Sequence, residues 1–224
     1  MKKTIAIGDI HGLKNWKKIV EEHPTDKIVF LGDYCDPYVQ ISNFDLLSNM
    51  LDIIELKQKR KDDIILLLGN HDMHYIYEDF PVSTRYNQDI ARLLQALFKD
   101  ERKLFQFAYQ DGNTLFTHAG VSNLWWDKYF KGNTNEGAPS IADQLNNPTE
   151  EQMKAMFLVG YGRGGNCECG SIFWADLDET CHDSLLGVHQ IVGHTQVEHM
   201  RTVSSSEETS ITYCDCLCHG KFCS

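Results

Sequence analysis

Uninterrupted runs of apolar residues, each followed at once by a glycine and a polar residue, dominate the first third of the chain. The runs lie within residues 4–7, 27–31 and 63–68, each of which begins with one polar residue. Short apolar runs bounded by turn residues are typical of strands that are buried on both faces. We therefore expect buried strands that deliver polar side chains to one edge of a sheet.

Apolar positions also recur at helical spacing between the first and second runs and between the second and third: Leu13, Trp16, Ile19 and Val20, then Phe44, Leu47, Leu51 and Ile54. This spacing predicts strand-helix-strand units. The basic stretch 57–61 is interpreted as a solvated helix end, where cations favour the helix dipole. A further helix is expected over 84–100.

Shorter elements follow. Residues 104–109 and 113–117 flank Asp111-Gly112, which indicates a hairpin. The stretch 132–148 is rich in Asn, Gly and Pro and is expected to be a loop. A capping box then opens a predicted helix over 149–158.

The chain is expected to close with strands at 188–192 and 209–213, joined through a polar turn region at 204–208. Crossover helices first and hairpins later predict a mixed sheet arrangement with helices outside, in the α/β or α+β class. We expect one domain over residues 1–224.

The composition is that of a globular protein, with 42% hydrophobic and 24% charged residues. The net charge of −11 argues against nucleic acid or an anionic membrane as the main partner. A phosphate ester stays compatible, because bound divalent cations reverse the sign inside a cleft. The first apolar stretch is too short for a signal sequence and no run reaches membrane-spanning length, so we expect a soluble cytoplasmic protein with eight reduced cysteines.

Six side chains with metal-binding atoms lie where predicted strands end: Asp9, His11, Asp33, Asn70, His118 and His194. Asp9 and His11 are two residues apart and can project to one side, and Asp33 has two oxygens with which to bridge two cations. Mixed carboxylate, amide and imidazole ligands favour Mn, Fe or Zn over Ca or Mg. Two such ions, about 3.5–4 Å apart, can bind ester oxygens and hold a water whose pKa they lower, so that this water becomes the nucleophile. Six other histidines are interpreted as surface or packing residues: His23, His74, His182, His189, His199 and His219.

Five motifs carry a resemblance to a known family: Gly8–Gly12, Gly32–Asp36, Gly69–Asp72, His118–Gly120 and Gly193–Thr195. In these motifs the chain resembles the calcineurin-like metallophosphoesterases, and within them the serine/threonine phosphoprotein phosphatases with their bacterial and phage relatives. The resemblance implies a four-layer sandwich of two mixed β-sheets flanked by helices. It also implies two divalent metal ions, manganese first, with iron or zinc as alternatives.

The resemblance assigns one metal to Asp9, His11 and Asp33, and the other to Asp33, Asn70, His118 and His194. It further implies that His71 protonates the departing alkoxide and that Asp36 orients His71 and favours its charged form. The alternative for Asp36 is a turn residue before Pro37.

The second motif departs from the family pattern. Pro37-Tyr38 stands where the family often has Arg-Gly, so one phosphate-clamping guanidinium is absent. Arg163, which lies among glycines, and Arg85 are the candidates to replace it, and Asn70 is a further candidate phosphate contact. For either arginine the alternative is a surface salt bridge.

Two further departures concern the third and fifth motifs. The third ends in Asp72 where eukaryotic relatives usually have Glu, and the fifth lacks a second histidine after His194. The missing histidine argues against the nuclease and cyclic-nucleotide branches and favours the phosphatase branch.

These features together predict a metal-dependent phosphoester hydrolase, most simply a phosphomonoesterase or protein serine/threonine phosphatase acting on a phosphorylated protein or a small phosphoester. A symmetrical dinucleoside polyphosphate hydrolase is the alternative enzyme, and a non-catalytic interaction module is the third hypothesis.

Trp125 and Trp126 are predicted to pack in the core rather than to wall the cleft. The cysteine groups 167/169 and 214/216/218 are interpreted as small buried residues, with a structural zinc site as the alternative.

Overall fold

The three apolar runs form adjacent strands of one sheet in the computed structural model, which describes residues 2–130 and 139–223. In spatial order this first sheet contains β1 (Thr4–Ile7), β2 (Lys27–Phe30), β3 (Ile64–Leu67) and β4 (Phe105–Gln106). All its pairings are parallel, with Ile28 opposite both Ile5 and Ile64. The expected mixed character is therefore absent from the described part of this sheet, because every connection between its strands is a crossover that returns the chain in the same direction.

The second sheet is mixed. In spatial order it contains β5 (Ala108–Asp111), β6 (Thr114–Thr117), β7 (His189–Gln196), β9 (Thr209–Asp215) and β8 (Arg201–Ser206). The three inner strands are parallel, whereas β5 and β8 are antiparallel edge strands. An apolar layer joins the two sheets and consists mainly of Ala6, Val29, Leu67, Phe116 and Cys214.

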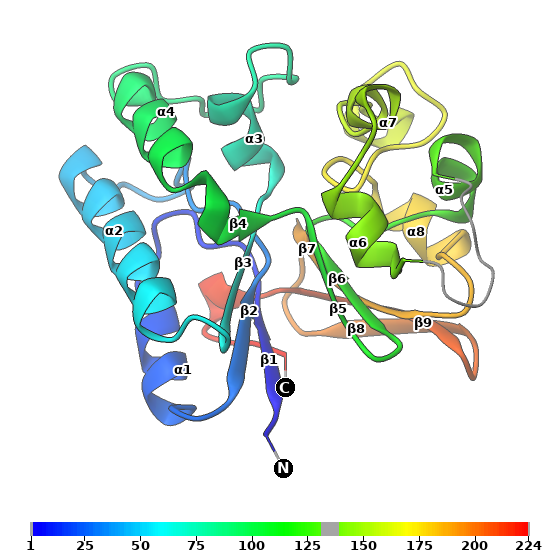
Figure 1. The fold of residues 1–224 in the computed structure, drawn as a ribbon, viewed down its shortest axis with the longest axis horizontal. Coiled ribbons are helices and arrows are strands. Elements are labelled where there is room, and N and C mark those ends of the chain that lie inside the picture. The colour runs from blue at the N-terminus through cyan, green and yellow to red at the C-terminus, as the bar shows by residue number, and fades with distance from the viewer. Residues whose placement is uncertain (1, 131–138, 224) are drawn as a thin grey trace.

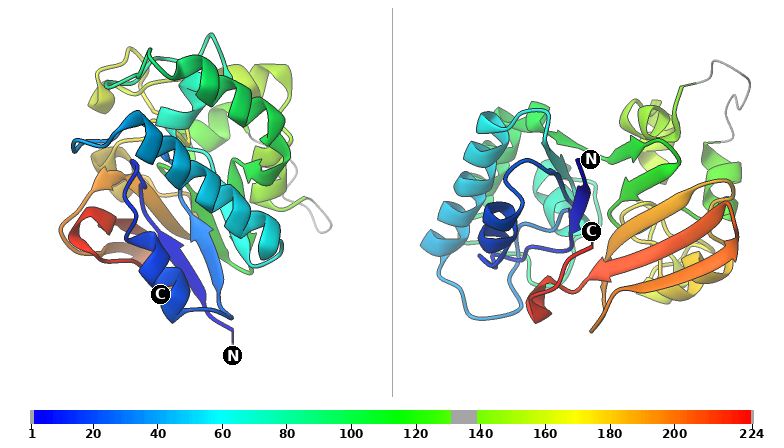
Figure 2. Two further views of the ribbon diagram at one scale, coloured as in Figure 1. Left: turned by 90° about the vertical axis from the view of Figure 1, so that its left-hand side faces the viewer. Right: turned by 90° about the horizontal axis from the view of Figure 1, so that it is seen from below.

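Helices form the two outer layers (Figures 1 and 2). On the side of the first sheet lie α1 (Trp16–Glu22), α2 (Asn43–Lys59), α3 (Asn70–Ile76) and α4 (Ala91–Asp100); on the side of the second lie α5 (Asn123–Tyr129), α6 (Ile141–Asn146), α7 (Glu150–Ala155) and α8 (Leu177–His182). Short 3₁₀ turns occupy Arg102–Leu104, Tyr161–Arg163 and Leu217–His219. The two stacked sheets with helices outside confirm the expected α/β architecture.

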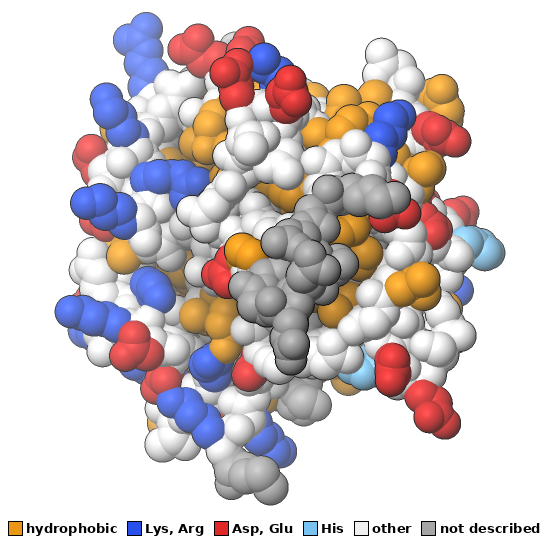
Figure 3. All heavy atoms as spheres, turned by 45° about the vertical axis from the view of Figure 1, so that its right-hand side comes forward, with side chains coloured by type: hydrophobic (Ala, Val, Ile, Leu, Met, Phe, Trp, Pro, Cys, Tyr) orange, Lys and Arg blue, Asp and Glu red, His pale blue; other side chains and the backbone are white. Residues whose placement is uncertain are grey.

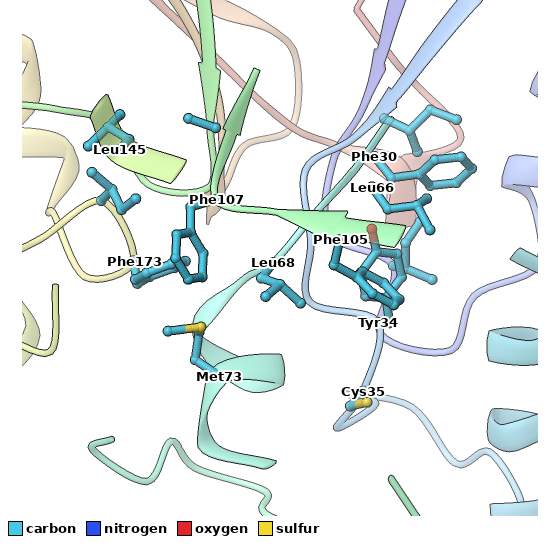
Figure 4. Close-up of a cluster of buried hydrophobic side chains, with 14 of the residues drawn as sticks. Phe30, Tyr34, Cys35, Leu66, Leu68, Met73, Phe105, Phe107, Leu145 and Phe173 are labelled. Atoms are coloured by element: carbon cyan, nitrogen blue, oxygen red, sulfur yellow. The ribbon is translucent and has the colours of Figure 1, made fainter. Parts of the chain in front are cut away.

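The predicted strand 104–109 is divided between the two sheets, since β4 pairs with β3 and β5 pairs with β6. Phe105 packs on Tyr34, with ring centres 5.7 Å apart, whereas Phe107 packs on Phe173, also at 5.7 Å (Figure 4). The chain thus passes from one sheet to the other within three residues. Hydrophobic alternation cannot reveal this crossing, because the surroundings are apolar on both sides of it.

The predicted helix over 84–100 is wrong in its first half, because α4 begins only at Ala91. Arg85 has a left-handed backbone with φ of 68°, and the side chain of Asn87 accepts the backbone N–H of Asp89 at 3.1 Å. Both features belong to turns and delay the helix.

Two predicted connections also differ. Residues 204–206 belong to β8, an edge strand whose mostly exposed side chains explain its polar sequence. Part of the predicted loop 132–148 lies outside the described residues, but α6 falls within its second part. Ser140 opens that helix, accepting the backbone N–H of Asp143 at 3.1 Å.

Trp125 and Trp126 are both buried in α5, which confirms the core interpretation. The indole Nε1 of Trp125 donates to the backbone oxygen of Ala155 at 3.2 Å. Both indoles therefore stabilise the helical layer beside the second sheet and do not wall the cleft.

The surface charge is unevenly distributed. On the face shown in Figure 3, Lys and Arg side chains gather on the left, whereas Asp and Glu side chains predominate toward the right. In the described part of the chain, no helix is both long and apolar enough to cross a membrane.

Candidate metal centre and active site

The six predicted ligands converge at the edge of the two sheets where β1, β2, β3 and β6 end and where β7 passes. Asp9 and His11 follow β1, Asp33 follows β2 and Asn70 opens α3 directly after β3. His118 follows β6 and His194 lies in the second half of β7. Five of the six line a cavity of about 480 Å³, and His118 is fully buried beneath them.

Asp33 lies between the two predicted metal sites. Its Oδ2 is 3.6 Å from Nε2 of His11 on one side and 3.5 Å from Nε2 of His118 on the other. Its Oδ1 accepts the backbone N–H of His71 at 2.8 Å. One oxygen is thus committed to the backbone, and the other is available to both ligand groups, as a bridging carboxylate requires.

In the first ligand group, His11 and Asp9 each use one polar atom for a backbone contact and direct the other toward the predicted metal site. His11 Nδ1 lies 2.8 Å from the backbone oxygen of Cys35, so it donates there and leaves Nε2 without a proton. That Nε2 lies 3.9 Å from Oδ2 of Asp9. The other Asp9 oxygen accepts the backbone N–H of His194 at 3.0 Å. Backbone contacts therefore orient both side chains toward the cavity.

The ligand atoms of the second group lie closer together than those of the first. Oδ1 of Asn70, Nε2 of His118 and Nδ1 of His194 lie 2.9–3.1 Å from one another. His118 Nδ1 donates to the backbone oxygen of Leu31 at 2.8 Å, and Asn70 Nδ2 donates to Ser83 Oγ at 2.9 Å. His118 Nε2 and Asn70 Oδ1 are consequently both acceptors, and no hydrogen lies between them.

Two lone pairs at 2.9 Å repel unless a cation accepts both, so this geometry fits a metal ion. Atoms that each lie about 2.1 Å from a shared ion, at right angles to one another, stand roughly 3 Å apart, which matches the spacing found. The second nitrogen of His194 is also buried without a hydrogen-bond partner. The residues present therefore fit divalent cations. Within the described residues, the groups that could hold such an ion consist of His and Asp side chains.

The pKa values of the clustered carboxylates and imidazoles also fit bound cations. Burial raises the pKa values of Asp9 and Asp33 well above their usual range, with Asp215 adding to the effect at Asp9 and Asp9 to that at Asp33. Burial lowers the pKa of His11 to about 4 and that of His118 to about 3. Both imidazoles are therefore neutral, and packed carboxylates gain from bound positive charge.

The backbone at this edge is strained. All five non-glycine residues with positive φ in the described chain are predicted site residues: His11, Asp33, Asp36, Arg85 and His194, with φ of 41–68°. Such conformations cost about 1–2 kcal/mol for a residue other than glycine. Four of these residues, all but Arg85, lie in the segments after β1 and β2 or within β7, which indicates that the fold holds these side chains in functional positions.

Two glycines allow the backbone to approach the ligands closely. A Cβ atom at Gly69 would lie 2.1 Å from Oδ1 of Asp33, and one at Gly193 would lie 2.4 Å from Oδ1 of Asp9. Any larger residue at either position would displace a predicted ligand.

His71 and Asp36 form the predicted dyad, with Nδ1 of His71 2.9 Å from Oδ2 of Asp36. The same carboxylate receives two further groups, since Nε2 of His74 also lies 2.9 Å from Oδ2 and the Tyr75 hydroxyl donates to Oδ1 at 2.6 Å. Burial alone would raise the pKa of Asp36, but these three donors outweigh it and hold the pKa below its usual value. Asp36 therefore stays ionised although its side chain is fully buried.

His74 is a buried packing residue, as one of the two interpretations predicted, but it also contacts the carboxylate of Asp36. The backbone N–H of Ser83 donates to Nδ1 of His74 at 3.1 Å, so the imidazole proton sits on Nε2, the nitrogen that lies 2.9 Å from Asp36. A histidine and a tyrosine at the third and fourth positions after His71 lie on the same face of a helix, and this spacing is the signal that could have identified them.

Asp72 is a second residue whose role the sequence reasoning missed. Its carboxylate accepts the backbone N–H groups of Asp33, Tyr34 and Gly69 at 2.8–2.9 Å. Burial raises its pKa to about 7. Asp72 thus ties the second motif to the third.

The two candidate arginines occupy different positions. Arg163 lines the cavity, with Nε 2.9 Å from Oδ2 of Asp176 and Nη2 donating to Thr195. Arg85 lies outside the lining residues, where its guanidinium stacks 4.4 Å from the ring centre of Tyr38. Arg163 is thus the arginine that faces the ligand groups.

Comparisons with known proteins agree with this site. A family model described as calcineurin-like phosphoesterase matches residues 2–197. No curated protein sequence matches at a significant level.

The chain is also similar to several solved structures. A cold-active protein tyrosine phosphatase has a TM-score of 0.57 at 19% identity, over 96% of this chain and 70% of that one, which shows the fold alone. A protein serine/threonine phosphatase from Saccharomyces cerevisiae (TM-score 0.45, 14% identity) is matched over 94% of this chain and 54% of its own. A metallophosphoesterase from Sphaerobacter thermophilus has a TM-score of 0.41 at 15% identity, over 94% of this chain and 74% of that one.

Proposed function

The chain belongs to the calcineurin-like phosphoesterase family, and from that premise we propose that it is a metal-dependent phosphomonoesterase whose substrate is a phosphorylated protein or a small phosphoester. The family makes it a hydrolase of phosphoester bonds. The proton-free contact between His118 Nε2 and Asn70 Oδ1 is the observation that supports metal dependence. Serine or threonine phosphate esters are the protein substrates that the resemblance favours.

We assign one cation to Asp9, His11 and Asp33, and the second to Asp33, Asn70, His118 and His194. Manganese is the proposed metal, with iron or zinc as alternatives. Divalent cations bound there supply positive charge for phosphoryl oxygens and lower the pKa of water toward neutrality. All eight cysteines are free thiols, which fits a reducing compartment such as the cytoplasm.

The remaining residues position the ester and move a proton. Arg163, held by Asp176 and Thr195, presents its planar guanidinium to the phosphoryl oxygens. In hydrolysis, a water oxygen forms a bond to phosphorus while the bond from phosphorus to the ester oxygen breaks. His71 donates the proton of Nε2 to that ester oxygen, because its Nδ1 is engaged with Asp36.

The test measures p-nitrophenyl phosphate hydrolysis by chelator-stripped protein reloaded with Mn, Zn or Mg. We expect turnover only with metal, and a loss of at least about 100-fold in Asp33→Asn and His71→Asn. His199→Asn, at an exposed histidine, is the matched control and keeps wild-type turnover. Hydrolysis of diadenosine tetraphosphate without monoester turnover would instead establish the dinucleotide enzyme, and metal binding with no turnover of either would favour a binding module.

A further inference from the structure

Three exposed apolar side chains stand at the mouth of the metal-lined cavity. Tyr38, Val39 and Val82, here called the apolar rim, are 56%, 56% and 65% exposed and all line that cavity. They come from two loops, one after β2 and one after α3. Exposed apolar groups that gather beside polar catalytic residues are typical of ligand contacts.

Tyr38 lies next to the groups that would handle the leaving oxygen. Its ring centre is 4.7 Å from that of His11, edge to face, and 6.2 Å from that of His71. If His71 protonates the leaving oxygen, the organic part of the ester extends from that oxygen past Tyr38. The apolar rim is therefore placed to contact the leaving group.

Arg85 holds the Tyr38 ring in place. Its guanidinium stacks 4.4 Å from the ring centre, and its Nη1 lies 3.4 Å from the backbone oxygen of Pro37. Arg85 therefore covers part of Tyr38, while more than half of the side chain stays open to a ligand. An aromatic ring packs well against such a surface, either edge to face or offset.

The charges along the cavity favour a single phosphoryl group. Arg163 is the one arginine or lysine among the described lining residues, whereas Asp9, Asp33 and Asp215 line the same space. A polyphosphate chain would bring several further negative charges without additional side-chain cations to meet them.

We propose that the apolar rim binds the aromatic ring of an aryl phosphate monoester, so that the enzyme prefers phenolic esters, including phosphotyrosine, over alkyl esters such as phosphoserine. This inference rests on the proposed phosphomonoesterase function. For phenyl phosphate, a water oxygen bonds to phosphorus and the bond to the phenolic oxygen breaks. The phenolic oxygen receives a proton from His71, and the products are phenol and inorganic phosphate.

The test compares kcat/KM for three substrates: phenyl phosphate, a phosphotyrosine peptide, and the same peptide with phosphoserine. We expect Tyr38→Ala and Val82→Asn each to lower the aryl-to-alkyl ratio about tenfold, mainly by raising KM for both aryl substrates. Tyr38→Phe, which keeps the ring, retains the wild-type ratio. Leu186→Asn replaces an apolar side chain that is 67% exposed and outside the cavity, and it is the control for placing a polar side chain on the surface.

The outcomes are separable. An equal fall for aryl and alkyl esters would show that Tyr38 acts through its histidine neighbours and would overturn the inference. A fall confined to the phosphotyrosine peptide, with phenyl phosphate unaffected, would place the rim against peptide residues and would also overturn it. Absence of turnover of every monoester by the metal-loaded wild type would refute the proposed function itself.

Discussion

His74 and Asp36 meet in the protein interior, where Nε2 of the imidazole lies 2.9 Å from Oδ2 of the carboxylate. The same oxygen is 2.9 Å from Nδ1 of His71. Since Ser83 fixes the tautomer of His74 through its backbone N–H, Nε2 carries the imidazole proton in this close polar contact with Asp36. His74 and His71 thus share one carboxylate oxygen, and we propose that His74 positions His71 through it.

We predict that His74→Leu lowers kcat for phenyl phosphate about tenfold, a fraction of the 10²–10⁴ that a proton donor contributes. The reason is that Asp36 loses a donor and holds His71 less firmly. The effect should shrink for 2,4-dinitrophenyl phosphate, whose leaving group needs no proton. His74→Gln keeps an N–H donor and should recover most of the activity; equal losses with both substrates would indicate structural damage instead.

Asp72→Ala should destabilise the fold and weaken metal binding together. The substitution leaves the buried backbone N–H groups of Asp33, Tyr34 and Gly69 without an acceptor, and each such group costs about 1–3 kcal/mol. Urea unfolding and calorimetric titration with Mn measure the two effects. Asp45→Ala, which removes an exposed ion pair with Lys14, is the control and should change stability by less than about 1 kcal/mol. Unchanged Mn affinity in Asp72→Ala would contradict the positioning role.

Gly69→Ala should abolish tight metal binding. The added methyl group would lie 2.1 Å from the Asp33 carboxylate and 2.7 Å from the His118 ring, so ligands must move, at a cost of about 1–3 kcal/mol. Gly187→Ala is the control for an added methyl group, because nothing lies within 4 Å of its new Cβ, although the backbone of Gly187 is left-handed (φ 76°) and that of Gly69 is extended. We expect the control to lose some stability and to bind Mn like the wild type. Equal Mn affinity in the two variants would refute the prediction.

The protein should lose stability in alkaline solution. Burial raises the pKa values of Cys169 and Cys216 from 9.0 to about 11 and that of Tyr213 from 10.0 to about 12. The contribution of these three groups to the free energy of unfolding is fully present below their ordinary pKa values. It is lost as pH rises through their raised pKa values. Urea midpoints should therefore fall between pH 9 and 12, and less so in Tyr213→Phe. Tyr161→Phe, at an exposed tyrosine, should follow the wild type, and a flat profile would contradict the prediction.

The sequence predicted which polar side chains would come together at one edge of the fold. Apolar runs that end in glycine and a ligand residue placed Asp9, Asp33 and Asn70 at strand ends, and parallel pairing then brings those ends to one edge. The family motifs added the dyad of His71 and Asp36, which the structure brings into hydrogen-bond contact. Element boundaries were less accurate where a polar edge strand resembled a turn or where the chain crossed between sheets.

The amino-acid sequence alone predicted the candidate ligand types, their order and the class of fold, because these depend on short-range periodicity and on motifs within a few residues. Which buried groups hold those side chains in place became visible only in the folded protein. Asp72 accepts the backbone N–H of Asp33, about 40 residues upstream, just after the end of β2. Asp215, near the other end of the chain, accepts the backbone N–H of Asp9. The position of Tyr38 beside the dyad was decided in the same way. Such contacts depend on how separate segments pack, and no local pattern encodes the distance between them.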